Sequence, residues 1–172
     1  LVVDSATVIL NANIIVSGYG QGGGTLTGPG NLTIQGGGNW SGGTMSGTGR
    51  TILGPTASMA FDINARTLSR VLENQGTITW TAGPLQLNSG QLLNTGTFIT
   101  NTTGLLQSYG TGGTNRFTNQ GIFRKQGTGT VQFTASSTGV AFDNGSTGTV
   151  EVQAGSLELL QGGPHTGNFN IT

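Results

Sequence analysis

The hydrophobic residues of this chain occur in short clusters, in which apolar and polar positions alternate, separated by Gly, Asn and Thr. The segment from Val71 to Gly83 shows this pattern most fully. Ile78 and Trp80 lie on one side of an extended chain and threonines lie on the other, because successive side chains of a strand point in opposite directions. Asn74 and Gly76 precede them as turn residues. The segment therefore predicts a tight corner followed by a short strand.

A unit with the same order of residues recurs three more times, at residues 92–98, 117–123 and 142–150. Each unit contains one asparagine at the same place, and these are Asn74, Asn94, Asn119 and Asn144. A period of roughly 20 to 25 residues is typical of solenoid proteins. We therefore expect the four asparagines to stack at one corner and to bond amide to amide. We expect the corner glycines to supply positive φ angles.

The rest of the chain keeps the same rhythm. Residues 1–16 contain three apolar clusters, which predict three short strands, and a Gly-rich connection is expected at residues 18–24. Residues 25–34 and 44–53 form a repeat pair one period apart, and residues 40–45 match residues 80–85 two periods away. One register thus runs through both halves, which predicts a single domain over residues 1–172, with residues 1–23 as a first or capping rung.

Residues 59–72 have two interpretations. Phe61, Ala65, Leu68 and Leu72 are spaced as on one face of a helix, whereas Met59, Phe61 and Ile63 alternate as in a strand. Strands are favoured because strand repeats lie on both sides. At about 21 residues per turn, the chain predicts an all-β fold, a single right-handed parallel β-helix (β-solenoid) of about eight rungs. At a strand spacing of about 4.8 Å, this is a rod about 40 Å long.

Composition narrows the classes of protein that the chain can belong to. Gly, Thr, Asn and Ser make up about half of the 172 residues, only 7% are charged, and the net charge is zero. This balance gives no electrostatic footprint for nucleic acid, and no apolar run is long enough to span a membrane. The absence of Cys removes disulfides and thiolate metal sites. Because the chain opens on Leu1 with a strand-like cluster, we expect a processed product or a segment of a longer protein.

Several of the units resemble a known class of repeats. Residues 40–47, 72–80 and 149–157 are similar to the degenerate repeats of large secreted bacterial proteins, namely autotransporter passengers and filamentous adhesins. The similarity extends over about residues 24–172 and is carried by composition as much as by motif. It implies a right-handed β-helix and a location at the cell surface, and it implies no catalytic residues.

The charged residues give little sign of catalysis. The carboxylates are dispersed along the chain and are Asp4, Asp62, Glu73, Asp143, Glu151 and Glu158. Glu73 with Arg70, or Asp143 with Lys125, would meet on adjacent rungs, but each is more simply an ion pair or a solvated charge. Polysaccharide-active β-helix enzymes need converging carboxylates. We therefore expect no enzyme activity, no cofactor and no metal site, and we expect the single histidine, His165, to lie on the surface.

Two arrays of surface side chains would give the chain a binding function in place of a purely structural one. Trp40 and Trp80 lie two rungs apart in one column and would stack on sugar rings if exposed. Core packing is favoured for both, since Trp80 falls on the same side as Ile78. Residues 77–81 would form an outward Thr array of the kind that orders water for ice binding, but Thr-x-Thr pairs do not recur at each rung.

These patterns predict a non-enzymatic extracellular segment that serves as a stalk, a fibre or a surface adhesin. One alternative is a fibre subunit that stacks end to end through its strand-like terminal rungs. Another is a carbohydrate-binding module that uses Trp40 and Trp80, or a β-helix polysaccharide lyase or hydrolase. The expected partners are other copies of the chain or neighbouring repeats, with surface glycans as an alternative, and neither nucleic acid nor membrane insertion is expected.

Overall fold

The computed structural model describes residues 1–103, 106–134 and 139–172, and within these residues every regular element is a β-strand. The strands form three parallel sheets, here called sheets A, B and C, in which nearly every strand pairs with the strand three places along the chain. Three successive strands therefore make one turn of a coil. The prediction of an all-β parallel solenoid is confirmed.

Sheet A consists of β1 (Val2–Val3), β4 (Tyr19–Gln21), β7 (Gly37–Trp40), β10 (Ser58–Phe61), β13 (Thr77–Trp80), β16 (Thr97–Thr100), β19 (Ile122–Lys125), β22 (Thr149–Val152) and β24 (Asn168–Ile171). Sheet B consists of β2 (Thr7–Ile9), β5 (Thr25–Thr27), β8 (Gly43–Met45), β11 (Arg66–Leu68), β14 (Leu85–Asn88), β17 (Leu106–Thr111), β20 (Thr130–Phe133) and β23 (Ser156–Leu159). Sheet C consists of β3 (Ile14–Val16), β6 (Leu32–Ile34), β9 (Arg50–Leu53), β12 (Val71–Asn74), β15 (Gln91–Asn94), β18 (Asn115–Asn119) and β21 (Val140–Asn144).

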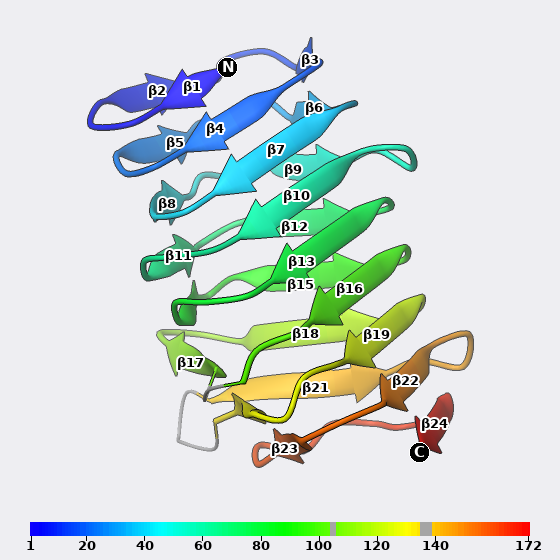
Figure 1. Ribbon diagram of the computed structural model, residues 1–172. Helices are drawn as coiled ribbons and strands as arrows, with labels where there is room; N and C mark the ends of the chain where they lie inside the picture. Colours follow the sequence, from blue (N-terminus) through cyan, green and yellow to red (C-terminus); the bar gives the residue numbers. More distant parts are fainter. Residues whose placement is uncertain (104–105, 135–138) are drawn as a thin grey trace.

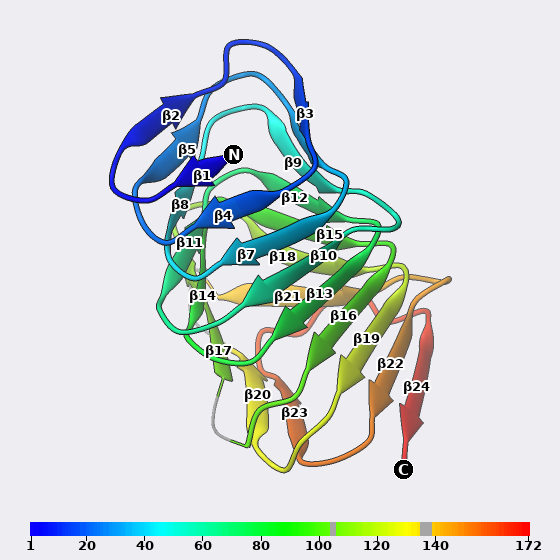
Figure 2. The ribbon, with the colours of Figure 1, turned by 45° about the horizontal axis from the view of Figure 1, so that its top comes forward.

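The turns stack into a right-handed coil with the two termini at opposite ends (Figure 1). Seen from the N-terminal end, the chain runs clockwise as it moves away from the viewer (Figure 2). This is the hand that parallel strand crossovers adopt in nearly all proteins. The described strands make up about eight turns, since sheet B contains eight strands and sheet A contains nine.

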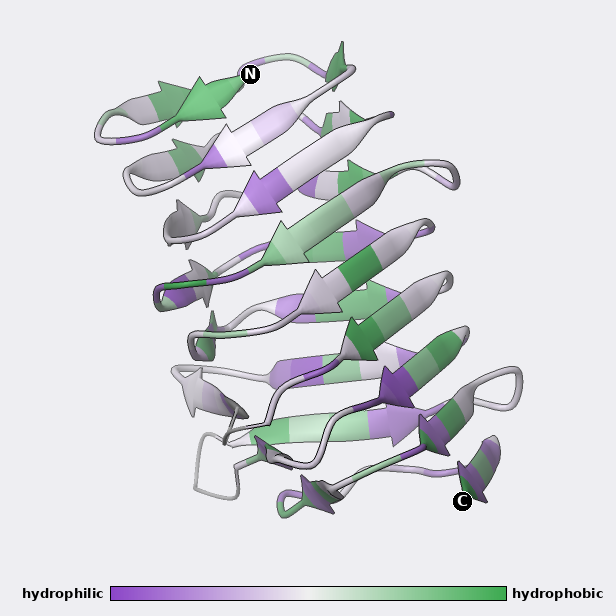
Figure 3. Ribbon diagram, viewed as in Figure 1, coloured by the Kyte–Doolittle hydropathy of each residue, from purple (hydrophilic) through white to green (hydrophobic). Residues whose placement is uncertain are grey.

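Alternation within each strand decides which side chains enter the coil. In β13, β16, β19 and β22 of sheet A the second residue points inward, and this column is fully buried from Ile78 through Phe98 and Phe123 to Val150. Figure 3 shows the matching stripes of apolar and polar residues along β22 and β24. Each buried aromatic or large aliphatic side chain contributes about 1.5–3 kcal/mol.

The core of the C-terminal half is built from phenylalanines supplied by all three sheets. Phe98 and Phe123 stack with ring centroids 5.7 Å apart, and Phe117 and Phe142 stack at 5.2 Å. Phe133 from sheet B meets the edge of Phe142 at 4.9 Å. Offset stacks and edge contacts of this kind are the favoured aromatic geometries. They tie the three sheets together across the interior.

Two local predictions have different outcomes. Ser58–Phe61, Arg66–Leu68 and Val71–Asn74 are β10, β11 and β12, so the strand interpretation of this segment is confirmed. The predicted alternation is wrong at Ile63, which lies in an exposed corner with a φ of 60°. The Gly-rich connection expected at residues 18–24 is wrong in part, because Tyr19–Gln21 is strand β4. Its residues Tyr19 and Gln21 point inward and are buried, and the Tyr19 hydroxyl donates to Gln21 Oε1 at 2.6 Å. A glycine between two inward side chains does not interrupt the strand.

The glycines at the corner between sheets C and A have a different role from the one expected. The backbone φ angles of Gly76, Gly96 and Gly121 are not positive. A Cβ atom on any of them would instead lie less than 3.0 Å from a carbonyl oxygen of the turn above. Positive φ occurs at the other two corners, where the glycines include Gly24, Gly28, Gly43, Gly47, Gly83, Gly127 and Gly155. The corner between sheets C and A thus needs glycine for close stacking of backbone on backbone.

This distinction predicts different effects of two Gly→Ala substitutions. Gly96→Ala places a methyl group against the carbonyl oxygen of Gly76 and should destabilise the fold by about 2–3 kcal/mol. Gly37→Ala, at an exposed position of β7, meets no atom within 4 Å and should raise stability by about 0.5–1 kcal/mol, because alanine costs less entropy in a strand. Urea denaturation of the two variants and the parent measures both changes. Equal effects at the two positions would contradict the close-stacking role of Gly96.

Candidate functional site

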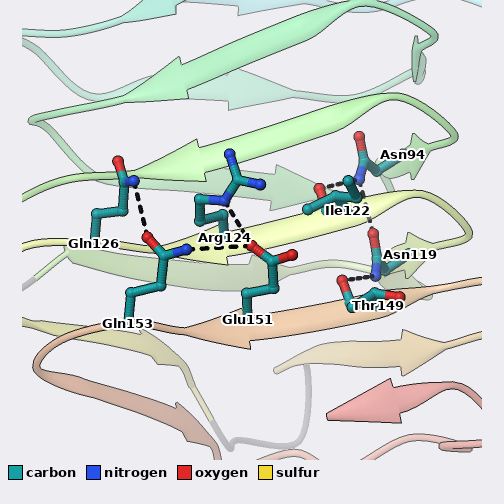
Figure 4. Close-up of polar contacts among 8 residues, drawn as sticks. All are labelled: Asn94, Asn119, Ile122, Arg124, Gln126, Thr149, Glu151 and Gln153. Atoms are coloured by element: carbon teal, nitrogen blue, oxygen red, sulfur yellow. Dashed lines mark hydrogen bonds and ion pairs between the residues drawn. The ribbon is translucent and has the colours of Figure 1, made fainter. Parts of the chain in front are cut away.

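The four predicted corner asparagines lie in one column at the end of sheet C. The Nδ2 atom of Asn74 donates to Oδ1 of Asn94 at 2.6 Å, that of Asn94 donates to Oδ1 of Asn119 at 2.7 Å, and that of Asn119 donates to Oδ1 of Asn144 at 2.9 Å. All four side chains are fully buried. Figure 4 shows the middle of this ladder, between Asn94 and Asn119. The predicted amide-to-amide stack is confirmed.

Each amide also bonds to the backbone of the next turn. The second Nδ2 hydrogen of Asn94 is donated to the carbonyl oxygen of Ile122 at 3.0 Å, and that of Asn119 to the carbonyl oxygen of Thr149 at 3.2 Å. The ladder has one open end, because Leu53 precedes Asn74 in the column and Asn74 Oδ1 accepts no bond. Since buried amides without partners cost free energy, the bonds between the paired amides stabilise the corner.

The two tryptophans are in the core, so the suggestion that they stack on glycans is wrong. Both indole rings have no exposed surface. They do share a column of sheet A, with Phe61 between them, and the Trp40 ring meets the edge of Phe61 at 5.3 Å. The Nε1 atom of Trp80 donates to the carbonyl oxygen of Gly83 at 2.8 Å. Neither ring offers a face to a sugar.

The carboxylates are distributed over different faces of the coil. Glu73 pairs with Arg50 on sheet C, where their closest atoms are 3.0 Å apart, and Asp143 pairs with Arg116 on the same sheet. Glu151 pairs with Arg124 on sheet A at 2.6 Å. The partners expected from the sequence, Arg70 for Glu73 and Lys125 for Asp143, are wrong, because both cations point into the interior.

Arg66 and Lys125 occupy the same corner, between sheets A and B, in different turns of the coil. Both are fully buried and bind inward-pointing backbone carbonyls. Lys125 Nζ donates to the carbonyl oxygens of Gln126 at 2.7 Å, Gly127 at 2.6 Å and Ala154 at 3.2 Å. Burial lowers the pKa of Arg66 to about 10, although nearby Asp62 opposes this, and burial also lowers the pKa of Lys125. Both cations cap carbonyls that water would otherwise satisfy.

Arg70 performs the same task at the corner between sheets B and C. Its Nε donates to the carbonyl oxygen of Gly49 at 2.8 Å and its Nη2 to that of Gly30 at 3.0 Å, so one guanidinium spans two turns. Burial lowers its pKa, partly offset by Tyr19. The expectation that Arg70 and Lys125 are ion-paired or solvated charges is therefore wrong. The alternation contained the correct signal, since Lys125 follows Phe123 by two positions and Arg66 precedes Leu68 by two.

A shallow groove of about 320 Å³ lies on the outer face of sheet A near its C-terminal end. It is lined by Arg124 of β19, Glu151 of β22, Asn170 of β24, and by Gln153 and Thr172, which directly follow β22 and β24. Arg124, Glu151 and Asn170 are register partners on three successive strands of the sheet. The groove is therefore a direct result of stacking the turns, and no single repeat contains it.

The polar side chains of the groove already form a network. Gln126 Nε2 donates to Oε1 of Gln153 at 3.0 Å, and Gln153 Nε2 and Arg124 Nε both donate to Oε2 of Glu151, at 3.4 and 2.6 Å (Figure 4). The lining contains one carboxylate. Beside this carboxylate the lining carries amide and guanidinium groups, which suit reversible hydrogen bonding to hydroxyl or amide groups. The single histidine, His165, is exposed beside Phe169, outside the groove.

Within the described residues, no three His, Cys, Asp or Glu side chains gather as metal ligands would. The described part of the chain also contains no helix that is long and apolar enough to cross a membrane. In comparisons with known proteins, no family model, curated protein or solved structure matches the chain.

The ladder predicts a pH-dependent effect of Asn94→Asp. A buried carboxylate at this position faces two acceptors, Asn119 Oδ1 and the Ile122 carbonyl oxygen, and should destabilise the fold by about 3–5 kcal/mol at pH 7. Burial raises the pKa of such a carboxyl, and the protonated form regains one donor. The deficit in free energy of unfolding should therefore shrink as the pH falls from 7 toward 4.

The matched control is Asn11→Asp in an exposed turn, which should change stability by less than about 0.5 kcal/mol at any of these pH values. Urea denaturation followed by circular dichroism compares the two variants with the parent. A deficit for Asn94→Asp that stays constant over this pH range would contradict the assigned hydrogen bonds.

Lys125 predicts a rise in stability on the alkaline side. Its pKa in the folded chain lies below the ordinary value of 10.5, so above the folded pKa the unfolded chain binds more protons. The free energy of unfolding contributed by Lys125 therefore increases as the pH is raised toward 10.5. Lys125→Met removes this contribution. The free energy of unfolding, measured by denaturation at several pH values between 8 and 10, should rise less steeply with pH for the variant than for the parent. Identical slopes would contradict the lowered pKa of Lys125.

Proposed function

We propose that the chain is a non-enzymatic structural or adhesive segment that acts outside the cell as a stiff β-solenoid spacer. The observation that carries this proposal is the continuous pairing of strands along the coil, with nine strands in sheet A and eight in sheet B. Each turn is bonded to its neighbours on three faces, so the coil resists bending in every direction. A solenoid of this kind gains length and stability with every added turn.

The arrangement of charge supports a passive role. Three Arg–carboxylate pairs link successive turns along the axis, and the buried cations cap backbone carbonyls. Ionised side chains used in this way fix the register of the stack. The resemblance to secreted repeat proteins supports a location at the cell surface.

The adhesive part of the proposal rests on the groove of sheet A. Gln153, Asn170 and the free edge of Arg124 present amide and guanidinium groups to solvent beside a concave surface. Planar polar side chains of this kind hydrogen-bond the hydroxyl groups of glycans. If many copies of the chain are present on one surface, multivalent binding would make the overall attachment strong although each contact is weak.

A second candidate function is end-to-end assembly. The terminal turns leave inward apolar side chains uncovered, with Val8, Ile14 and Val16 only partly buried at one end and Ile171 75% exposed at the other. Exposed strand edges with apolar side chains readily pair with another chain. Either a neighbouring repeat or a second copy would satisfy these edges.

The first experiment measures the shape of the chain and its adhesion to glycans. X-ray scattering of the purified chain should give a rod, and beads coated with the chain should be retained on glycan-coated surfaces. Gln153→Ala in the groove should reduce retention, whereas Gln35→Ala, at an exposed corner away from the groove, should not. Equal retention of both variants would contradict the groove as the contact.

Two further measurements separate the remaining functions. Polygalacturonate and alginate incubated with the chain should yield no new reducing ends or unsaturated products, and turnover of either would contradict the non-enzymatic role. Sedimentation and electron microscopy over a concentration series distinguish single rods from filaments. Filaments support end-to-end assembly, and rods of constant length at all concentrations contradict it.

A further inference from the structure

The outer face of sheet B carries two columns of mainly hydroxyl side chains over the first four turns. The first column follows the register of β2, β5, β8 and β11 and consists of Thr7, Thr25, Thr44 and Thr67. The second column lies two positions further along each strand and consists of Ile9, Thr27, Ser46 and Ser69. Three successive turns thus present Thr-x-Thr or Thr-x-Ser in register, which we call the hydroxyl face.

The residue between the two columns points into the core in each of these three turns. Leu26, Met45 and Leu68 have no exposed surface, so the flanking side chains are directed outward by the alternation of the strand. The hydroxyl face carries no charged side chain. Arg66 and Arg70 flank Thr67-Leu68-Ser69 on either side, but both guanidinium groups are turned inward onto backbone carbonyls.

The other outer surfaces lack paired hydroxyl columns or carry charged side chains. On sheet A, Thr79 has Ala60 and Ile99 as its register neighbours, so the Thr array at residues 77–81 does not continue into the adjacent turns as a paired column. Ion pairs cross the outer faces of sheet C and of the C-terminal part of sheet A. Below the fourth turn, the first hydroxyl column continues into Gln86 and Tyr109.

The spacing of the hydroxyl face is fixed by the backbone. Neighbouring strands lie about 4.8 Å apart, and side chains two positions apart in one strand are about 6.6–6.8 Å apart. Threonine adds rigidity, because its branched side chain is restricted at χ1 and presents one methyl group and one hydroxyl group. The result is a neutral, two-dimensional lattice of hydroxyl and methyl groups with a repeat close to that of oxygen atoms in ice.

We propose that the hydroxyl face binds the surface of ice. An ice surface is an uncharged lattice of water molecules, and each contact with it is weak. A rigid array whose groups repeat with a similar spacing engages many lattice positions at once and loses little entropy in doing so. A charged side chain would instead hold its own hydration shell and disturb the lattice. This function is independent of adhesion through the groove, because the two surfaces lie on different sheets.

The hydroxyl face is not apparent in the sequence, because the number of residues between successive threonines of its first column is not constant. The step from Thr44 to Thr67 is longer than the steps from Thr7 to Thr25 and from Thr25 to Thr44. The difference arises because longer corners, at residues 54–57 and 62–65, separate the third turn from the fourth. A search at one fixed period misses the fourth turn.

The test compares two Thr→Lys variants that are matched in burial. Thr44 is in the centre of the hydroxyl face, and Thr79 is on the outer face of sheet A; both are half-buried. The parent chain should shape ice crystals, slow their recrystallisation and lower the freezing point below the melting point. Thr44→Lys should lose this activity at concentrations where Thr79→Lys retains it. Circular dichroism and thermal melting establish that each variant is folded, and Thr27→Lys in the second column replaces Thr44→Lys if that variant does not fold.

A measurement on the parent chain alone completes the test. A fluorescently labelled chain should be incorporated into a growing ice hemisphere, on specific planes of the crystal. Exclusion of the folded chain from ice overturns the proposal, as does equal loss of activity in Thr44→Lys and Thr79→Lys. Adhesion of beads to glycans would be unaffected by Thr44→Lys, so failure of ice binding and failure of the groove are distinguishable.

Discussion

The whole structure depends on the hydrogen bonds that join each turn to the next in parallel register. These bonds require the strand residues of successive turns to lie above one another, whatever the length of chain between them. The chain from Ile122 to its partner Thr149 is longer than the chain from Thr77 to its partner Thr97. The corners absorb the difference, because extra residues there do not interrupt a ladder. Side chains far apart in the sequence therefore form regular columns.

The parts of the structure that could be predicted are those in which one residue type repeats at one corner. The four copies of the Asn-containing unit located the sheet C corner, and alternation of Ile78 and Trp80 assigned both to one side of a strand. Such features depend on local sequence alone. The overall fold followed from them, since short strands joined by tight corners at a nearly constant period have few ways to bury their apolar side.

The parts that could not be predicted depend on contacts between residues in successive turns of the coil. Gly96 was assigned a conformational role, but the carbonyl oxygen of Gly76 in the turn above is what excludes a side chain there. Lys125 was taken for a surface charge, because three inward carbonyls at the corner are invisible in the sequence. The groove at Arg124 and Glu151 likewise exists only after the register between β19 and β22 is known.

The asparagine ladder is directional, and this has a consequence for how the coil is assembled. Both Nδ2 hydrogens of Asn94 are donated to the following turn, one to Asn119 and one to the backbone of Ile122. A folded turn therefore presents two fixed donors at its C-terminal edge, and the next turn satisfies both only when it is aligned without a slip. Each turn of the ladder from Asn74 to Asn119 thus acts as a template that selects the correct alignment of the next turn. A chain that emerges from the ribosome N-terminus first would form these turns in the order in which each template is needed.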